Sequence, residues 1–281
     1  MRVWVGTELG GGITDPGTAG LSVLDHGALL GDGLFETVLT RAGIPVALGQ
    51  HLTRLHNSAT VLGFKSVSDE ALRAAIVETL DADDVRASTT GRLRITVTSG
   101  AGPLGMSRGA VPTIIVLWES FTPSSQPLTL ITSSQPRWSG DGLLAHKHTS
   151  WLSNVISFHE AKAAGASDAL LLNERGEVLE TTTANIFAIK DQTLITPLVS
   201  SGCLPGVTRQ LLIDCLTPDI RFAQMSFSRE DLLSCDEVFV TSSLRLIQPV
   251  SQIDGTAMPR CGEFATKLMA LLEQNLESAD V

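Results

Sequence analysis

The sequence contains no tyrosine among its 281 residues, and aromatic side chains of all kinds make up only 5% of it. No phenol can therefore donate or accept a proton in an active site formed by this chain. The cysteines, Cys203, Cys215, Cys235 and Cys261, are far apart and form no C-x-x-C pair, and the histidines are not clustered. We therefore expect reduced thiols, no disulfide bond and no metal site.

Runs of positive charge and long apolar runs are also missing. The formal net charge is -10, from 20 lysines and arginines against 30 acidic residues. This balance does not favour binding to nucleic acid or to an anionic membrane surface. No stretch approaches the roughly 18 apolar residues of a membrane-spanning helix, and the first residues do not resemble a signal peptide. We therefore expect a cytoplasmic protein that binds neither nucleic acid nor membranes.

The chain is long and apolar enough, at 43% hydrophobic residues, to form two domains. Apolar residues repeat at intervals of three and four in some segments and of two in others. Strands and helices are mixed without a strict β-α-β rhythm, which favours an α+β fold over a doubly wound sheet. The expected helices cover about 49–63, 68–80, 150–164 and 260–277, and the expected strands include 92–98, 112–118, 168–172 and 185–190.

The segment from Glu119 to Pro127 is rich in serine, threonine and proline and is the best candidate for a domain boundary. We expect an N-terminal domain over 1–118, a linker over 119–127 and a C-terminal domain over 128–281.

Lys147 lies between His146 and His148 before an expected helix, and it is the only lysine or arginine between Arg137 and Lys162. Its neighbours are apolar, so we expect partial desolvation, which disfavours the ammonium ion and lowers the pKa from about 10.4. A neutral amine attacks aldehydes and other carbonyls, which is the starting condition for Schiff-base chemistry. The alternative is an ordinary surface lysine beside a helix cap.

Three other segments carry polar groups at expected element ends. Pro205–Arg209 places glycine and threonine where a helix begins, and free N–H groups there can bind phosphate; an ordinary capped turn is the alternative. Thr241–Ser243 could add hydroxyl groups at a strand end, although such clusters are common. Glu180 precedes a threonine-rich turn and an apolar strand, where a solvated carboxylate is the alternative.

Taken together and in this order, these segments resemble the fold-type IV family of pyridoxal-phosphate enzymes. The resemblance extends to Val23–Gly27, Gly31–Thr37 and Ile247–Val250, and so covers nearly the whole chain. The family includes branched-chain aminotransferases, D-amino-acid aminotransferases and 4-amino-4-deoxychorismate lyases. The resemblance implies a two-domain α+β architecture like that of D-amino-acid aminotransferase, with a smaller N-terminal α/β domain. It also implies pyridoxal 5'-phosphate as cofactor, a small-molecule substrate and a homodimer.

The resemblance also implies roles for individual residues. Lys147, in the larger C-terminal domain, would hold the cofactor covalently and transfer protons. Glu180 would face the pyridine nitrogen. The cofactor's phosphate would be bound by Arg54, by Val207 and Thr208 of the turn, and by Ser243 with Ser242 beside it.

Within the family, the chain resembles the lyases more than the aminotransferases. Its length is close to theirs, it lacks the tyrosines that aminotransferases place around the substrate, and Lys147–Leu152 resembles their K-x-x-x-[YW]-L pattern, with Trp151 at the aromatic position. Such a lyase releases pyruvate and forms 4-aminobenzoate for folate synthesis. The alternatives are a D-amino-acid or branched-chain aminotransferase, and a cofactor-binding protein without turnover. The retention of Lys147, Glu180 and Arg54 together argues against the last.

The motifs do not define which residues bind the substrate carboxylates. The arginine- and glycine-rich loop of the lyases is matched only loosely, by 99–109. Arg94, Arg108 and Arg137 are candidates, and a surface or structural role is the alternative for each.

Overall fold

The computed structural model describes residues 1–65 and 67–279, with the side chains of 277–279 excepted. The chain divides into two compact units. The first comprises Met1–Pro123 together with Lys147–Trp151, and the second comprises Ser124–His146 together with Leu152–Val281.

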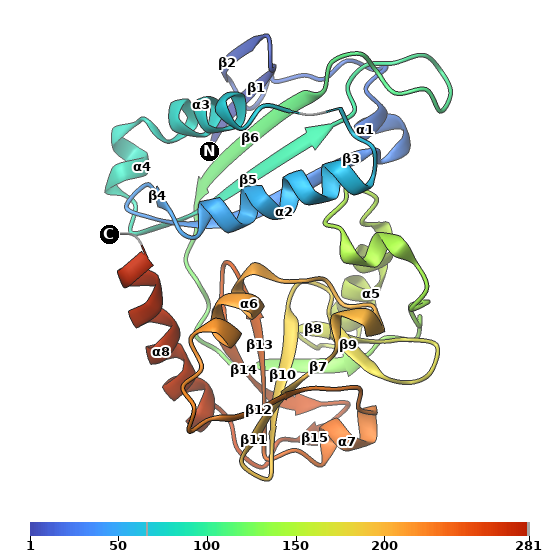
Figure 1. The fold of residues 1–281 in the computed structure, drawn as a ribbon, viewed down its shortest axis with the longest axis vertical. Helices are drawn as coiled ribbons and strands as arrows, with labels where there is room; N and C mark the ends of the chain where they lie inside the picture. Colours follow the sequence, from blue (N-terminus) through green and yellow to red (C-terminus); the bar gives the residue numbers. More distant parts are fainter. Residues whose placement is uncertain (66, 280–281) are drawn as a thin grey trace. The chain divides into compact units, whose positions relative to one another are not determined.

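The first unit contains a six-stranded antiparallel sheet with the strand order β2-β1-β6-β5-β3-β4. Its strands are β1 (Arg2–Thr7), β2 (Gly10–Thr14), β3 (Gly33–Arg41), β4 (Ile44–Pro45), β5 (Thr90–Thr98) and β6 (Thr113–Ser120). Its helices are α1 (His26–Leu30), α2 (Leu48–Val61), α3 (Asp69–Leu80) and α4 (Asp83–Ala87). Helices α2 and α3 lie on one face of this sheet (Figure 1).

The core of the first unit lies between those helices and the sheet. Strand β5 alternates, so that Leu93 and Ile95 are buried in this core while Arg94 lies on the opposite face. Helix α3 begins where Ser68 Oγ accepts a hydrogen bond from Ala71 N, and acidic side chains occupy its first turn. The helix-covered face therefore forms the core of this unit, and Arg94 lies on the face that these helices do not cover.

The second unit contains a nine-stranded sheet with the order β12-β11-β10-β13-β14-β7-β8-β9, and β15 pairs with β14. Strand β9 also pairs with β10, which closes β10, β13, β14, β7, β8 and β9 into a barrel. These strands are β7 (Leu128–Thr132), β8 (Asp168–Leu172), β9 (Val178–Thr181), β10 (Asn185–Lys190), β11 (Thr193–Thr196), β12 (Arg221–Gln224), β13 (Glu237–Ser242), β14 (Leu246–Ile253) and β15 (Thr256–Ala257).

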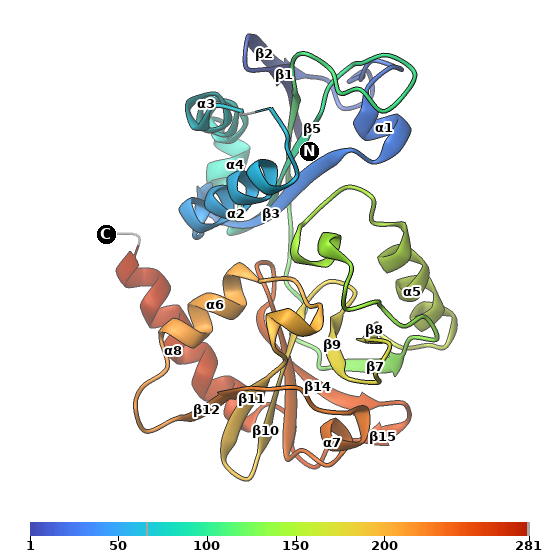
Figure 2. The same ribbon diagram turned by 45° about the vertical axis from the view of Figure 1, so that its right-hand side comes forward.

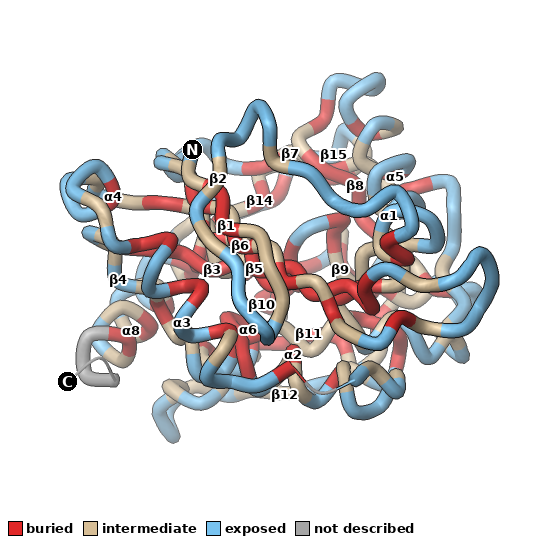
Figure 3. Tube along the Cα trace, turned by 90° about the horizontal axis from the view of Figure 1, so that it is seen from above, coloured by how far each residue is buried: buried red, intermediate tan, exposed pale blue. Residues whose placement is uncertain are grey.

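The helices of the second unit pack around this barrel. They are α5 (Leu152–Ala163), α6 (Val207–Asp214), α7 (Arg229–Leu233) and α8 (Glu263–Ala279), with short 3-10 helices at Gly142–Ala145 and Val199–Ser201. Helix α6 lies beside α8, and both contact β13 (Figure 2). Buried positions, red in Figure 3, concentrate in the strands, whereas many of the turns between them are exposed. Among the helices of the described residues, none is both long and apolar enough to cross a bilayer.

The α+β prediction is confirmed, because one antiparallel and one mixed sheet each carry helices. The helices expected over 49–63 and 68–80 are present as α2 and α3. Strand β6 continues to Ser120, into the segment expected as a linker, and the boundary between the units follows Pro123. Lys147 lies within the range predicted as the C-terminal domain, and its segment groups with the first compact unit.

Candidate active site

The segment Lys147–Trp151 groups with the first unit because its backbone pairs with the start of β3. Phe35 N donates to Lys147 O at 2.8 Å, Thr149 N donates to Gly33 O at 2.8 Å, and Thr149 Oγ1 donates to Gly31 O at 2.7 Å. Gly31 has a φ of 68°, a conformation that favours glycine. The lysine is thus held by backbone hydrogen bonds to a strand of a distant part of the sequence.

The amine of Lys147 lies against two aromatic rings. Nζ is 4.4 Å from the centre of the Phe35 ring and 5.0 Å from that of Trp151, and the two rings meet edge to face at 86°. Lys147 is half-buried, which confirms the expected partial desolvation. Because the faces of aromatic rings attract cations, both rings can hold the Lys147 amine in place.

Arg94 lies over the same aromatic ring as Lys147. Its guanidinium carbon is 3.8 Å from the centre of the Phe35 ring, and Nε reaches Thr96 Oγ1 at 3.4 Å. Burial lowers the pKa of Arg94. Within the described part of the chain it has no carboxylate partner, yet arginine stays charged in proteins. A half-buried guanidinium of this kind is suited to bind an anion.

Arg54 is held by a carboxylate that the sequence did not identify as part of the site. Its Nε and Nη2 lie 2.8 and 2.5 Å from the two carboxylate oxygens of Glu36 on β3. His51, one helical turn before Arg54, places Nδ1 2.7 Å from Glu36 Oε2. The His51 side chain is buried against Glu36. An acidic residue within an otherwise apolar strand was the signal that could have identified Glu36.

The electrostatics of this cluster favour an ionised Glu36. Burial alone would raise the pKa of Glu36, but the charge of Arg54 and the hydrogen bond from His51 outweigh it and lower the pKa to about 2. Burial also lowers the pKa of His51, and the nearby charges of Arg54 and Lys147 act in the same direction. The charges of both Lys147 and Arg54 affect the pKa of His51, so the two cations lie near the same histidine in the first unit.

Arg108, the second carboxylate-binding candidate, has structural partners. Its Nε and Nη2 each donate to an oxygen of Asp32 at 2.8 Å, and Nη1 donates to Leu62 O at 2.7 Å. Its guanidinium also lies 4.1 Å from the centre of the Phe64 ring. Arg108 therefore fastens the loop after β5 to the rest of the first unit.

In the second unit, Glu180 on β9 accepts hydrogen bonds from Asn185 and Leu204. Oε2 accepts a hydrogen bond from Asn185 Nδ2 at 3.1 Å and another from Leu204 N at 3.1 Å. Donors of this kind stabilise the charged form of a carboxylate. Arg137 lies nearby: burial lowers its pKa, and the charges of Glu180 and Asp141 oppose that effect.

Helix α6 begins at the turn that the sequence indicated. Its N-cap, Gly206, has no side chain and makes no side-chain cap hydrogen bond, so the cap residue supplies no acceptor for the first N–H groups. Thr208 is buried in the first turn. Arg209, also buried, fixes the helix by donating Nη2 to Pro197 O at 3.0 Å and to Gln224 Oε1 at 2.7 Å.

Ser242 ends β13, and Ser243 follows it. Thr241 on this strand pairs with Asn185 on β10, and its buried Oγ1 has no hydrogen-bond partner among the described atoms. Since Asn185 also contacts Glu180, the carboxylate, the start of α6 and the end of β13 lie at one end of the barrel. An uncapped helix, a carboxylate and an orphaned hydroxyl at one end of the barrel fit a ligand that carries both an anionic group and a group that can donate a proton.

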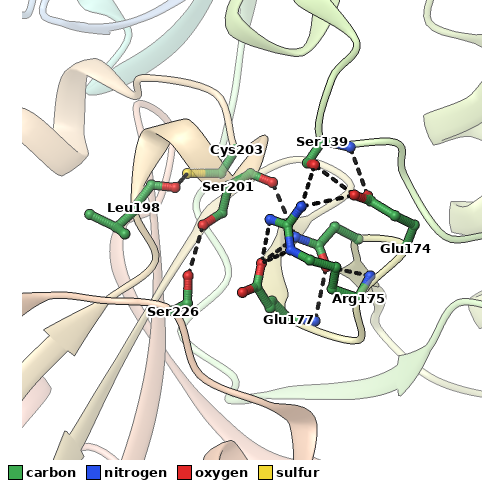
Figure 4. Close-up of polar contacts among 9 residues, drawn as sticks. Ser139, Glu174, Arg175, Glu177, Leu198, Ser201, Cys203 and Ser226 are labelled. Carbon is green, nitrogen blue, oxygen red and sulfur yellow. Dashed lines mark hydrogen bonds and ion pairs between the residues drawn. The ribbon is translucent and has the colours of Figure 1, made fainter.

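The loop that leads to Lys147 is fastened to the turn between β8 and β9. Ser139 N and Oγ donate to the Glu174 carboxylate at 2.8 and 2.7 Å, and Arg175 Nη1 donates to Ser139 Oγ at 2.7 Å (Figure 4). In the same turn, Asn173 Nδ2 donates to Glu177 Oε2 at 2.6 Å. These contacts are largely exposed, so each adds little stability alone.

The predicted residues thus fall into two clusters. The lysine cluster in the first unit contains Lys147 and Arg54, and the carboxylate cluster in the second contains the remainder: Glu180, Val207, Thr208, Ser242 and Ser243. Sequence reasoning did not assign roles to the residues that hold these groups, namely Phe35, Glu36, His51 and Asn185.

Comparison with known proteins identifies the family. Residues 33–253 match the family described as Amino-transferase class IV. A protein of Methanocaldococcus jannaschii named "Putative branched-chain-amino-acid aminotransferase" is 33% identical over 92% of this chain and 92% of its own length. The D-alanine aminotransferase of Bacillus licheniformis is 30% identical over 84% of this chain and 83% of its own. The aminodeoxychorismate lyase of Bacillus subtilis is 26% identical over 92% of this chain and 90% of its own.

Solved structures agree in fold. A Legionella pneumophila protein titled "Putative 4-amino-4-deoxychorismate lyase" matches with a TM-score of 0.86 and 30% identity, over 93% of this chain and 97% of that one. A Mycobacterium tuberculosis protein described as "A hypothetical aminotransferase", in its PLP-bound form, matches with a TM-score of 0.85 and 25% identity, over 98% of this chain and 99% of that one. The chain therefore belongs to the class IV aminotransferase family and has its fold-type IV architecture.

Proposed function

We propose that this protein is a pyridoxal 5'-phosphate enzyme in which Lys147 and Glu180 contact the cofactor's aldehyde carbon and ring nitrogen. Pyridoxal phosphate is the cofactor of the family and supplies an electron sink for reactions beside a bound amine. The carboxylate cluster supports the proposal, because Glu180 is held by two donors next to an uncapped helix. Thr208, Ser243 and the N–H groups of α6 would bind the phosphate together with Arg54, and Ser242 lies beside them.

Lys147 has the surroundings that a proton-transfer group needs. Phe35 and Trp151 cover its amine on two sides and limit the access of water. Backbone hydrogen bonds to β3 hold the main chain of Lys147 in place. When its Nζ is not joined to the cofactor, it can take a proton from the substrate and return it elsewhere.

Within the family we propose the activity of an aminodeoxychorismate lyase, which releases pyruvate and forms 4-aminobenzoate. The observation that carries this choice is Arg94, a half-buried guanidinium that shares the Phe35 ring with Lys147 and has no carboxylate partner in the described structure. A cyclic substrate with carboxylates would place an acid on Arg94 and its ring proton near Lys147 Nζ. The phenol-free surroundings of the lysine agree with this choice.

An aminotransferase acting on D- or branched-chain amino acids is the second candidate, favoured by the identity of 33% to the Methanocaldococcus protein. Two assays of the holoenzyme separate them. With aminodeoxychorismate, a lyase forms 4-aminobenzoate and pyruvate in equal amounts without a second substrate. With D-alanine, leucine or glutamate and a 2-oxo acid, an aminotransferase transfers the amino group. Transfer without 4-aminobenzoate would overturn the lyase proposal.

We expect Arg94→Met to raise KM for aminodeoxychorismate and to lower kcat/KM by about 10- to 100-fold, the usual worth of a hydrogen bond to a charged group. Arg92 provides the matched control, since it lies on the same face of β5 but already pairs with Glu119 at 3.2 Å. Arg92→Met should leave kcat/KM within about twofold. Equal losses in both variants would show that the strand, and not the anion site, had been damaged.

We also propose that the protein is a homodimer. The first unit exposes apolar side chains on the loop after β5 and on the segment around α1, including Val23 at 83%, Leu104 at 83% and Met106 at 88%. The two segments lie together, because Gly102 N donates to Leu24 O at 3.1 Å. Exposed apolar groups that gather in this way mark association surfaces. Light scattering should give twice the mass of 29.8 kDa for the wild type and less for Leu104→Asp/Met106→Asp; a monomeric wild type would refute the proposal.

A further inference from the structure

Asn185 joins several of the groups assigned to the cofactor in the second unit. It is 5% exposed, and its Nδ2 donates to Glu180 Oε2 at 3.1 Å and to Leu204 O at 2.8 Å. Both hydrogens of the Asn185 side-chain amide therefore already donate hydrogen bonds. Its backbone pairs with Glu180 on one side and with Thr241 on the other. One amide thus links the carboxylate on β9 with the segment that leads into α6.

The other end of the same amide faces the N-cap of α6. A Cβ atom added to Gly206 would lie 1.9 Å from Asn185 Oδ1. The backbone of Gly206, with φ at -68° and ψ at 137°, is one that alanine adopts freely. Residue 206 is therefore restricted to glycine by the Asn185 side chain rather than by its own conformation.

We infer that Asn185 is a positioning residue that sets the Glu180 carboxylate against the N-terminus of α6, so that one rigid ligand can engage both. The inference rests on the proposed function. Without the Nδ2 donor, Glu180 loses the hydrogen bond from Asn185, and Leu204 loses the donor to its carbonyl oxygen. The carboxylate then becomes less favourable in its charged form and free to turn away from the helix.

Titration of the apoprotein with pyridoxal 5'-phosphate, followed by absorbance and fluorescence, tests this role. Asn185→Ala should weaken binding by about tenfold or more, the worth of a hydrogen bond to a charged group. It should also shift the visible band of the bound cofactor and the pH at which that band changes. A role confined to folding would leave the band and its pH dependence unchanged.

Asn173 offers a matched control in the same unit. It is equally buried and donates Nδ2 to a glutamate, Glu177, and at 3.4 Å to a backbone carbonyl, Ser201 O. Its Oδ1 also accepts hydrogen bonds from Arg175 N and Glu177 N, both at 3.0 Å. Asn173→Ala should therefore lower stability toward urea at least as much as Asn185→Ala does, without changing the affinity or the band. An Asn173→Ala variant with the same spectral shift would overturn the inference.

Gly206→Ala gives a second, independent variant. The new methyl group should displace the Asn185 amide and reproduce the loss seen in Asn185→Ala. Once Asn185 is alanine the methyl group has room, so the double variant should bind about as well as either single one. Losses that multiply would show two separate effects and contradict the role of Asn185.

Binding of pyridoxal phosphate by the wild type distinguishes a failure of the proposed function from a failure of the role proposed for Asn185. A wild type that binds no pyridoxal phosphate would overturn the proposed function and this inference with it. A wild type that binds it, beside an Asn185→Ala variant with unchanged affinity and band, would overturn the inference alone.

Discussion

Lys147→Ala should abolish measurable turnover, because general acid–base catalysis alone contributes about 10²–10⁴-fold and the covalent link would be lost as well. The structure supports this expectation by placing Nζ against Phe35 and Trp151 and by fixing the backbone on β3. Steady-state release of 4-aminobenzoate measures the effect. Lys147→Arg should be equally inactive, since guanidinium keeps its charge and forms no such link.

Lys162 on α5 is the matched control for the lysine. It is exposed and also lies near an aromatic ring, with Nζ 5.0 Å from the centre of Phe158. Lys162→Ala should keep wild-type activity. An active Lys147→Ala variant, within tenfold of the wild type, would refute the catalytic role of Lys147.

Glu36→Gln should destabilise the protein by about 3 kcal/mol or more at neutral pH. The folded pKa of Glu36, about 2, lies below its ordinary value of 4.5, so the folded state favours the ionised group and is stabilised above pH 4.5. The substitution also leaves Arg54 without its buried carboxylate, a loss that typically costs about 3–5 kcal/mol. Urea unfolding at pH 7 measures the difference.

The pH dependence of the unfolding free energy tests whether the ionised carboxylate of Glu36 causes this stabilisation. As pH falls from about 5 toward 2, Glu36 becomes protonated in the unfolded state while it stays ionised in the folded state. The difference in unfolding free energy between the wild type and Glu36→Gln should therefore shrink. His51 adds a loss in the same direction, beginning near pH 6.5, because its folded pKa is also lowered. Glu119→Gln, which alters an exposed pair with Arg92, should change stability by under about 1 kcal/mol. A difference between the wild type and Glu36→Gln that is constant with pH would contradict the ionised cluster.

Local patterns were enough to predict much of the fold. Periodicity located α2 and α3, and the Pro-Gly turn marked the start of α6, because these features depend on neighbouring residues. The order of the motifs indicated the α+β fold and the family. The grouping of Lys147 with the first unit was not predictable, since it depends on backbone pairing with a strand more than one hundred residues earlier.

The residues that hold the site were missed for the same reason. Glu36 gains its role from His51 and Arg54 on the next helix, and Asn185 from Glu180 and Gly206 on other elements. The three arginine candidates looked alike in the sequence. Only their contacts distinguish Arg108, which is paired with Asp32, from the other two: Arg94 and Arg137.

The covalent role of Lys147 is tested most directly by borohydride reduction of the protein after addition of pyridoxal 5'-phosphate, followed by digestion and mass spectrometry. We predict a single stable pyridoxyl group on the peptide that contains Lys147, in equimolar amount with the chain. An unmodified Lys147 peptide, with the label absent or spread over other lysines, would contradict the proposed function.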